Sequence, residues 1–120
     1  MKRVLIVDDS IAVARQLEKI VVSTGEFEMV GHAKNGAEAI RMKQTSKPDV
    51  ICMDMNMPVM DGLTALRTLM AMDPEAKVVM VTSLGGVGDK FAEALRLGAK
   101  SVLSKPFEAD TVLKTLRELA

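Results

Sequence analysis

Aspartate residues follow two apolar segments of the sequence, at points where a strand would end. Asp8 and Asp9 come directly after the run RVLIV at residues 3–7, and Asp54 follows VICM at residues 50–53. Short apolar runs bounded by polar residues are typical of buried strands in a parallel sheet. The carboxyl ends of such strands share one edge, where open α/β sheets place their chemistry. We therefore expect the three carboxylates to converge on one site.

Clustered carboxylates of this kind suit the chemistry of phosphate. Neighbouring carboxylates raise one another's pKa values unless a cation relieves the repulsion, and carboxylate oxygens suit Mg²⁺, which also takes phosphate oxygens. A carboxylate can attack phosphorus and form an aspartyl-phosphate. Two further strand ends carry the hydroxyl of Thr82 and the ammonium of Lys105. These residue types point to phosphoryl transfer onto Asp54, with Mg²⁺ and Lys105 neutralising the transferred charge.

The rest of the sequence alternates between strand-like and helix-like segments that can position these groups. Strands are predicted at residues 3–7, 27–33, 49–53, 77–81 and 101–104. Apolar residues at helical spacing predict a helix after each strand, beginning near Ile11, Asn35, Asp61, Asp89 and Glu108. This (βα)₅ order predicts one α/β domain over residues 1–120, with a parallel sheet covered by helices on both faces.

Two helix starts carry capping residues, and the fourth helix has a predicted inward face. Asn35 begins a capping-box pattern, and Asp61 can cap the third helix. In the fourth helix, the spacing predicts that Phe91, Ala94 and Leu95 face inward.

Composition excludes several classes of function. Sixteen basic and 16 acidic residues give a net charge of zero, which argues against nucleic-acid binding through charge alone. No apolar run approaches the roughly 20 residues of a membrane span. The single cysteine, Cys52, lies in a predicted buried strand and is expected to be structural. We expect a cytoplasmic monomer that does not bind membranes.

Four motifs, in this order and spacing, carry a resemblance to a known family. VLIVDDS, MDMNMPVMDG, VTS and KPF resemble the receiver domain of two-component response regulators. Within that family the chain is similar to the single-domain chemotaxis regulators of the CheY type. The resemblance covers essentially the whole chain. It implies a flavodoxin-like three-layer sandwich with a five-stranded parallel sheet of order 2-1-3-4-5.

The resemblance also implies a role for each acidic position. Asp54 would accept the phosphoryl group from a histidine kinase. Asp9 and Asp54 would ligate Mg²⁺ through their side chains, Asn56 through its backbone carbonyl, and Asp8 through a water molecule. The protein would have at most self-phosphorylation from small phosphodonors and slow self-dephosphorylation, and would otherwise be no enzyme.

The remaining motifs would stabilise the phosphoryl group and transmit its presence. Lys105 would pair with the phosphoryl group, and the Lys105–Pro106 bond would be cis. Thr82 would bond a phosphoryl oxygen and report phosphorylation to the face made by the fourth and fifth strands. The family usually has Tyr or Phe three residues before its lysine, where this chain has Val102. We hypothesise that the glycine-rich loop at residues 84–88 supplies the mobility instead.

Several alternatives compete with a free-standing chemotaxis regulator. The chain could be a receiver module cut from a larger regulator, or a phosphorylation-independent docking domain. A flavin-binding protein would need aromatic residues, and the chain has three Phe but no Tyr or Trp. A phosphatase-type enzyme would need an acid near its nucleophile, where Asn56 stands. The downstream target could be the flagellar motor or an output domain.

Histidine and methionine residues have simpler interpretations. His32 is predicted to be a surface histidine on the outward side of an edge strand, and not a phosphodonor. Met53 and Met80 are predicted to fill the core. The loop methionines are a smaller candidate surface for a partner: Met55, Met57 and Met60.

Overall fold

Strands and helices alternate strictly along the chain. The computed structural model describes residues 1–83 and 89–120. Its strands are β1 (Lys2–Val7), β2 (Phe27–Ala33), β3 (Val50–Asp54), β4 (Val78–Ser83) and β5 (Ser101–Lys105). Its helices are α1 (Ile11–Val22), α2 (Gly36–Ser46), α3 (Gly62–Met72), α4 (Asp89–Leu97) and α5 (Ala109–Leu119). The predicted (βα)₅ order is confirmed. None of the described helices is both long and apolar enough to cross a membrane.

All five strands are parallel and form one sheet of order β2-β1-β3-β4-β5, as the resemblance implied. The central strand β3 lies between β1 and β4, and every residue of β3 is buried. Because the strands are parallel, their carboxyl ends share one edge of the sheet. The polar residues that follow β1, β3, β4 and β5 are therefore gathered there.

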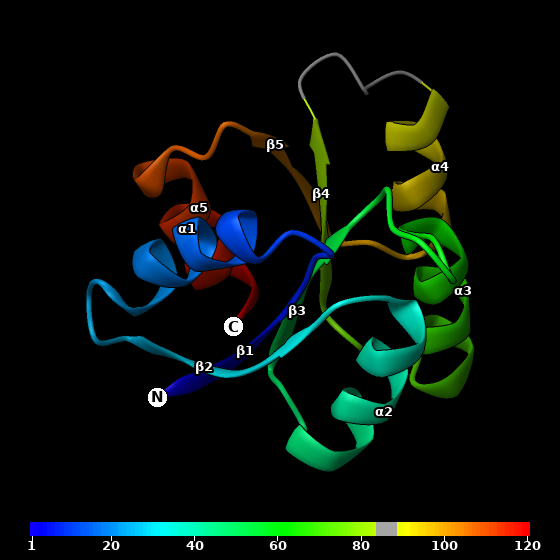
Figure 1. The fold of residues 1–120 in the computed structure, drawn as a ribbon, viewed down its shortest axis with the longest axis horizontal. Coiled ribbons are helices and arrows are strands. Elements are labelled where there is room, and N and C mark those ends of the chain that lie inside the picture. The colour runs from blue at the N-terminus through cyan, green and yellow to red at the C-terminus, as the bar shows by residue number, and fades with distance from the viewer. Residues whose placement is uncertain (84–88) are drawn as a thin grey trace.

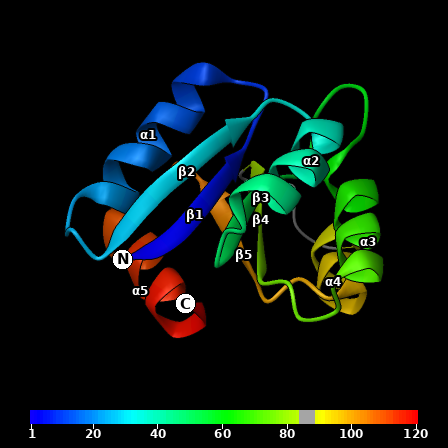
Figure 2. The same ribbon diagram turned by 90° about the horizontal axis from the view of Figure 1, so that it is seen from below.

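Helices cover the sheet on both faces, which makes a flavodoxin-like three-layer sandwich (Figure 1). Helices α1 and α5 lie on one face, and α2, α3 and α4 lie on the other (Figure 2). Side chains of β1 alternate between two cores: Leu5 and Val7 face α2–α4, whereas Val4 and Ile6 face α1 and α5. Cys52 lies in the second core, where burial raises the pKa of its thiol to about 12. This thiol is structural, as predicted.

Polar side chains begin the first three helices close to the strand ends. The side-chain oxygens of Ser10, Asn35 and Asp61 each accept a hydrogen bond from the backbone amide three residues further on. The caps predicted at Asn35 and Asp61 are confirmed. Because Ser10 caps α1, the carboxylates of Asp8 and Asp9 are not used for this purpose.

Helix α4 covers the sheet through a narrower face than its sequence suggests. Ala94 is fully buried, but 38% of Phe91 and 42% of Leu95 are exposed. The prediction that both of these large residues face inward is therefore wrong. The helix packs through Ala94 and the half-buried Leu97. The apolar face that its sequence predicts is therefore wider than the face that is buried.

Candidate functional site

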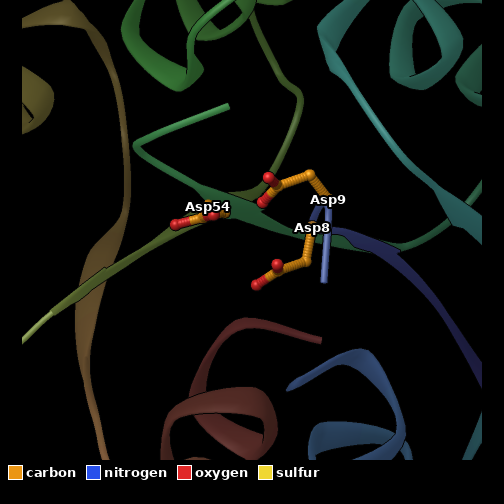
Figure 3. Close-up of side chains that lie close together, drawn as sticks. All are labelled: Asp8, Asp9 and Asp54. Atoms are coloured by element: carbon orange, nitrogen blue, oxygen red, sulfur yellow. The ribbon is translucent and has the colours of Figure 1, made fainter. Parts of the chain in front are cut away.

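The three aspartates lie together at the carboxyl edge of the sheet (Figure 3). Asp8 and Asp9 follow β1, and Asp54 is the last residue of β3, which pairs directly with β1. One carboxylate oxygen of each residue lies within 4.8 Å of those of the other two. Two neighbouring parallel strands thus bring together residues that are far apart in the sequence.

Burial differs sharply among the three carboxylates. Asp8 and Asp54 are 3% and 5% exposed, whereas Asp9 is exposed. Burial raises the pKa of Asp54 above its ordinary value, and the charge of Asp8 raises this pKa further, while Lys105 opposes the shift. Asp54 therefore loses its proton less readily than a surface aspartate does. A cation bound in the cluster would favour the charged form, and a carboxyl group can act as a nucleophile only in that form.

Lys105 supplies the one positive charge that the described residues place against the buried carboxylates. Its Nζ lies 3.3 Å from Oδ2 of Asp8 and 3.6 Å from Oδ1 of Asp54. The lysine ends β5, and the Lys105–Pro106 bond is cis, as expected. One ammonium group faces three carboxylates, so the site has an excess of negative charge.

Asp8 is held by hydrogen bonds as well as by this ion pair. Its backbone amide donates to the carbonyl of Ala33 at 3.0 Å, and its Oδ1 accepts from the amide of Ser10 at 2.9 Å. The first contact fixes the end of β1 against the end of β2, and the second holds the carboxylate against the start of α1. They also explain how a nearly buried carboxylate stays satisfied beside Asp54.

The segment after Asp54 turns back closely over the strand end. The amide of Met55 donates to the carbonyl of Val81, and the amide of Gly62 donates to the carbonyl of Met55. A Cβ at Gly62 would overlap with the backbone oxygen of Asp54 and lie 2.7 Å from Cα of Met55. Glycine at position 62 therefore permits the backbone approach that shapes the site. Within the same turn, Asn56 is exposed, and its amide lies 3.4 Å from Oδ1 of Asp54.

Thr82 lies on the strand next to Asp54. In the pairing of β3 with β4, Asp54 is opposite Val81, so Thr82 is one residue further along the same edge. Thr82 is 2% exposed, and its hydroxyl donates to the carbonyl of Ser83 at 3.4 Å. The strand continues through Ser83, two residues beyond the predicted end. The hydroxyl thus belongs to a regular strand and not to the loop.

The donor atoms of the cluster fit a hard divalent cation. All three donors are carboxylate oxygens, the ligands that Mg²⁺ and Ca²⁺ prefer, and no thiolate or imidazole belongs to the group found among the described residues. Asp9 is exposed, which leaves one side of the cluster open to waters or phosphate oxygens. This open arrangement matches the way Mg²⁺ binds through few carboxylates and retains several waters.

His32 contributes to this edge of the sheet, which the sequence interpretation missed. The ring is half-buried, and its Nε2 lies 2.8 Å from the backbone oxygen of Asp8. The prediction of an outward surface histidine is therefore wrong. The register pairs Ile6 with His32, so the side chain can reach across to the end of β1. A strand order that places β2 beside β1 is the signal that could have identified this contact.

The loop methionines belong largely to the core. Met55 is 3% exposed, so its suggested role as a partner contact is wrong. Met57 and Met60 are half-buried and pack against the core on the α2–α4 side. Met53 and Met80 are fully buried, as predicted.

A pocket of about 340 Å³ lies beside Lys105, between β5 and the start of α5. Its lining includes Val102, Pro106 and Thr111. Val102, at the position where the resemblance implies an aromatic ring, is half-buried. The loop at residues 84–88, which we hypothesised to be mobile, lies outside the described residues.

A family model described as the response regulator receiver domain matches residues 4–117. The chain therefore belongs to the response regulator receiver domain family. Among receiver domains it is of the CheY type: it is 43% identical over 120 residues to the chemotaxis protein CheY of Listeria monocytogenes, covering 100% of this chain and 99% of that one.

Solved structures agree with this assignment. The response regulator domain of Thermotoga maritima CheB is 36% identical, with a TM-score of 0.91, and the match covers 99% of this chain and 96% of that one. A CheX–CheY–BeF₃–Mg²⁺ complex from Borrelia burgdorferi contains a chain that is 35% identical, with a TM-score of 0.89, covering 98% of this chain and 87% of that one. The structural comparison therefore supports the same family as the sequence comparison.

Proposed function

We propose that this protein is a phosphoacceptor switch of a two-component system. Asp54 accepts a phosphoryl group from a histidine kinase in a Mg²⁺-dependent reaction, and the modified protein changes its affinity for a partner. One observation carries the proposal: Asp54 is nearly buried at the carboxyl edge of the sheet, among Asp8, Asp9 and the ammonium of Lys105. An aspartate that served only the fold would not need this arrangement.

The reaction requires little beyond positioning and neutralisation of charge. A carboxylate oxygen of Asp54 forms a bond to phosphorus, while the bond between phosphorus and the donor nitrogen breaks. The electron pair of that bond leaves with the donor imidazole. Lys105, held against the carboxylates, would pair with an oxygen of the transferred group. Thr82 lies next along the edge, and its hydroxyl would donate a hydrogen bond to a second oxygen of the transferred group. This bond would change the face made by β4 and β5.

The same residues would hold the metal ion. Asp9 and Asp54 would bind Mg²⁺ through their carboxylates, Asn56 through its backbone carbonyl and Asp8 through a water molecule. When bound, the ion would neutralise negative charge on the phosphoryl oxygens. The exposed Asp9 leaves room for the incoming group, and the buried Asp8 keeps its pairing with Lys105. The donor set and the excess of negative charge both support this assignment.

Chemotaxis is the pathway that similarity to CheY supports, with the protein acting as a cytoplasmic monomer. A protein target is supported by the neighbouring structure in which CheY is bound with CheX. The target could be a flagellar motor component or an output domain. The resemblance to the CheB domain keeps a role as one module of a larger regulator as the alternative. No catalysis is proposed beyond acceptance from small phosphodonors and slow loss of the phosphoryl group.

The intact mass of the wild-type protein tests the proposal. After incubation with acetyl phosphate and Mg²⁺, we expect one phosphoryl adduct, which peptide mapping places on the segment containing Asp54. Replacing Mg²⁺ with an excess of EDTA should abolish the adduct, because the clustered carboxylates then lose the cation that relieves them. Absence of any adduct with Mg²⁺ present would favour a phosphorylation-independent docking domain.

The Lys105→Met variant should accept the phosphoryl group about tenfold more slowly than wild type at saturating Mg²⁺, because one positive group near the transferred oxygens is lost. The lysine side chain is 23% exposed, so water screens part of its charge and the effect stays moderate. Lys114→Met, which replaces an exposed lysine of α5, is the matched control and should react like wild type. Equal rates for the two variants would remove Lys105 from the proposed machinery.

A further inference from the structure

The hydrogen bond between His32 and the end of β1 has a defined donor and acceptor. Nε2 of His32 lies 2.8 Å from the backbone oxygen of Asp8. A carbonyl oxygen only accepts hydrogen bonds, so Nε2 carries the proton and donates. The hydrogen bond therefore fixes which ring nitrogen is protonated. It also ties a side chain of β2 to the backbone of the acidic site.

The oxygen that accepts this hydrogen bond belongs to the peptide group that joins Asp8 to Asp9. The sheet ladder does not occupy it, because β2 ends at Ala33 and no backbone amide of the described residues is found to donate to it. The amide of Asp8 is already bonded to Ala33. The imidazole thus takes the place of a backbone donor at the last position of the β1–β2 pair.

The orientation of the Asp9 carboxylate depends on this peptide group more than the orientations of the Asp8 and Asp54 carboxylates do. Asp8 and Asp54 are buried and paired with Lys105, but Asp9 is exposed. Within residues 1–83 and 89–120, no hydrogen bond or ion pair is found for the Asp9 carboxylate. Its direction is therefore set mainly by the backbone from which it projects. A change in the plane of the Asp8–Asp9 peptide would swing this carboxylate relative to the other two.

We propose that His32 is a positioning residue for metal binding. By holding the Asp8–Asp9 peptide, it keeps the carboxylate of Asp9 within reach of those of Asp8 and Asp54, and so strengthens the binding of Mg²⁺. Partners that orient metal ligands in this way commonly affect metal affinity. The inference rests on the proposed function, since it assigns the cluster to Mg²⁺.

Isothermal titration calorimetry with Mg²⁺ alone tests the inference on the unphosphorylated full chain. His32→Phe keeps a ring of similar shape but removes the donor, and should weaken Mg²⁺ binding about tenfold. His32→Gln offers an amide donor at similar reach, and should bind Mg²⁺ within about twofold of wild type. Glu28→Gln, near the amino end of the same strand, controls for general effects on β2 and should bind like wild type.

Kinetics separate positioning from a structural defect. In His32→Phe, the Mg²⁺ concentration that half-saturates phosphorylation by acetyl phosphate should rise by the same factor, whereas the rate at saturating Mg²⁺ should change little. Equal Mg²⁺ affinity in His32→Phe and wild type would overturn the inference, as would equal weakening in His32→Phe and His32→Gln. If His32→Phe does not fold, His32→Asn, whose amide is too short to reach, replaces it. Failure of the wild type to bind Mg²⁺ would instead refute the proposed function.

Discussion

The Asp54→Asn variant is expected to carry no phosphoryl group after incubation with acetyl phosphate and Mg²⁺. An amide lacks the nucleophilic oxygen anion that attacks phosphorus, so the effect is a complete loss of the adduct. Intact mass spectrometry measures it directly. Asp61→Asn is the matched control, because asparagine caps helices as well as aspartate does and Asp61 caps α3. A phosphoryl adduct on Asp54→Asn would place the acceptor on another residue.

The same variant should show a pH-dependent gain in stability in the absence of Mg²⁺. Folding raises the pKa of Asp54, chiefly through burial and then through the charge of Asp8. The favourable contribution of the protonated carboxyl is therefore present at low pH and is lost as the pH rises through its folded-state pKa. The amide that replaces this carboxyl cannot ionise. The unfolding free energy of Asp54→Asn should match that of wild type in acid and exceed it at neutral pH.

Urea unfolding followed by far-ultraviolet circular dichroism measures this difference, since the chain contains no Trp or Tyr for fluorescence. EDTA keeps both proteins free of metal. Adding Mg²⁺ should then stabilise the wild type more than the variant, because the variant has lost one carboxylate ligand. A constant difference in unfolding free energy across the pH range would show that Asp54 ionises in the folded state as it does when unfolded.

The Gly62→Ala variant should lose about 3 kcal/mol of unfolding free energy, because its Cβ meets backbone atoms and not a flexible side chain. The overlapping atoms are the carbonyl oxygen of Asp54 and Cα of Met55, so relief of the clash must shift the strand end that carries Asp54. We therefore expect slower phosphorylation as well as lower stability. Urea unfolding and the adduct assay measure the two effects.

Gly25→Ala is a control of a different kind for that variant. Gly25 has a φ of 75°, but a Cβ there would meet nothing within 4 Å. This variant should lose only about 1 kcal/mol, through backbone strain, and should be phosphorylated at the wild-type rate. If Gly62→Ala were no less stable than Gly25→Ala, the close approach of α3 to β3 would not limit the site.

The fold was largely predictable because its signals are local. Apolar runs that stop at Asp8 and Asp54 mark buried strands, and Asn35 and Asp61 mark helix starts by the hydrogen bonds that their side chains make. Alternation of these elements favours a parallel sheet, and a parallel sheet gathers strand ends. The convergence of the three aspartates with Lys105 follows from topology without any knowledge of side-chain detail.

The errors arose where a contact depends on the partner strand or on the width of a packed surface. The position of His32 seemed outward from the period of β2 alone, but its ring reaches the carbonyl at the end of β1. Periodicity likewise placed Phe91 and Leu95 inward, although the sheet covers only the face around Ala94. Met55 has a loop-like sequence context, yet the turn after β3 folds it into the core.

The ion pairs of Lys105 with Asp8 and Asp54 join three strands that emerge from the ribosome at very different times. Domains synthesised from the amino terminus expose their early segments long before the last ones appear. A nascent chain that ends before β5 has both aspartates but not the lysine that pairs with them. The pairing of these carboxylates with an ammonium group therefore forms only late in biosynthesis, after residue 105 has been added.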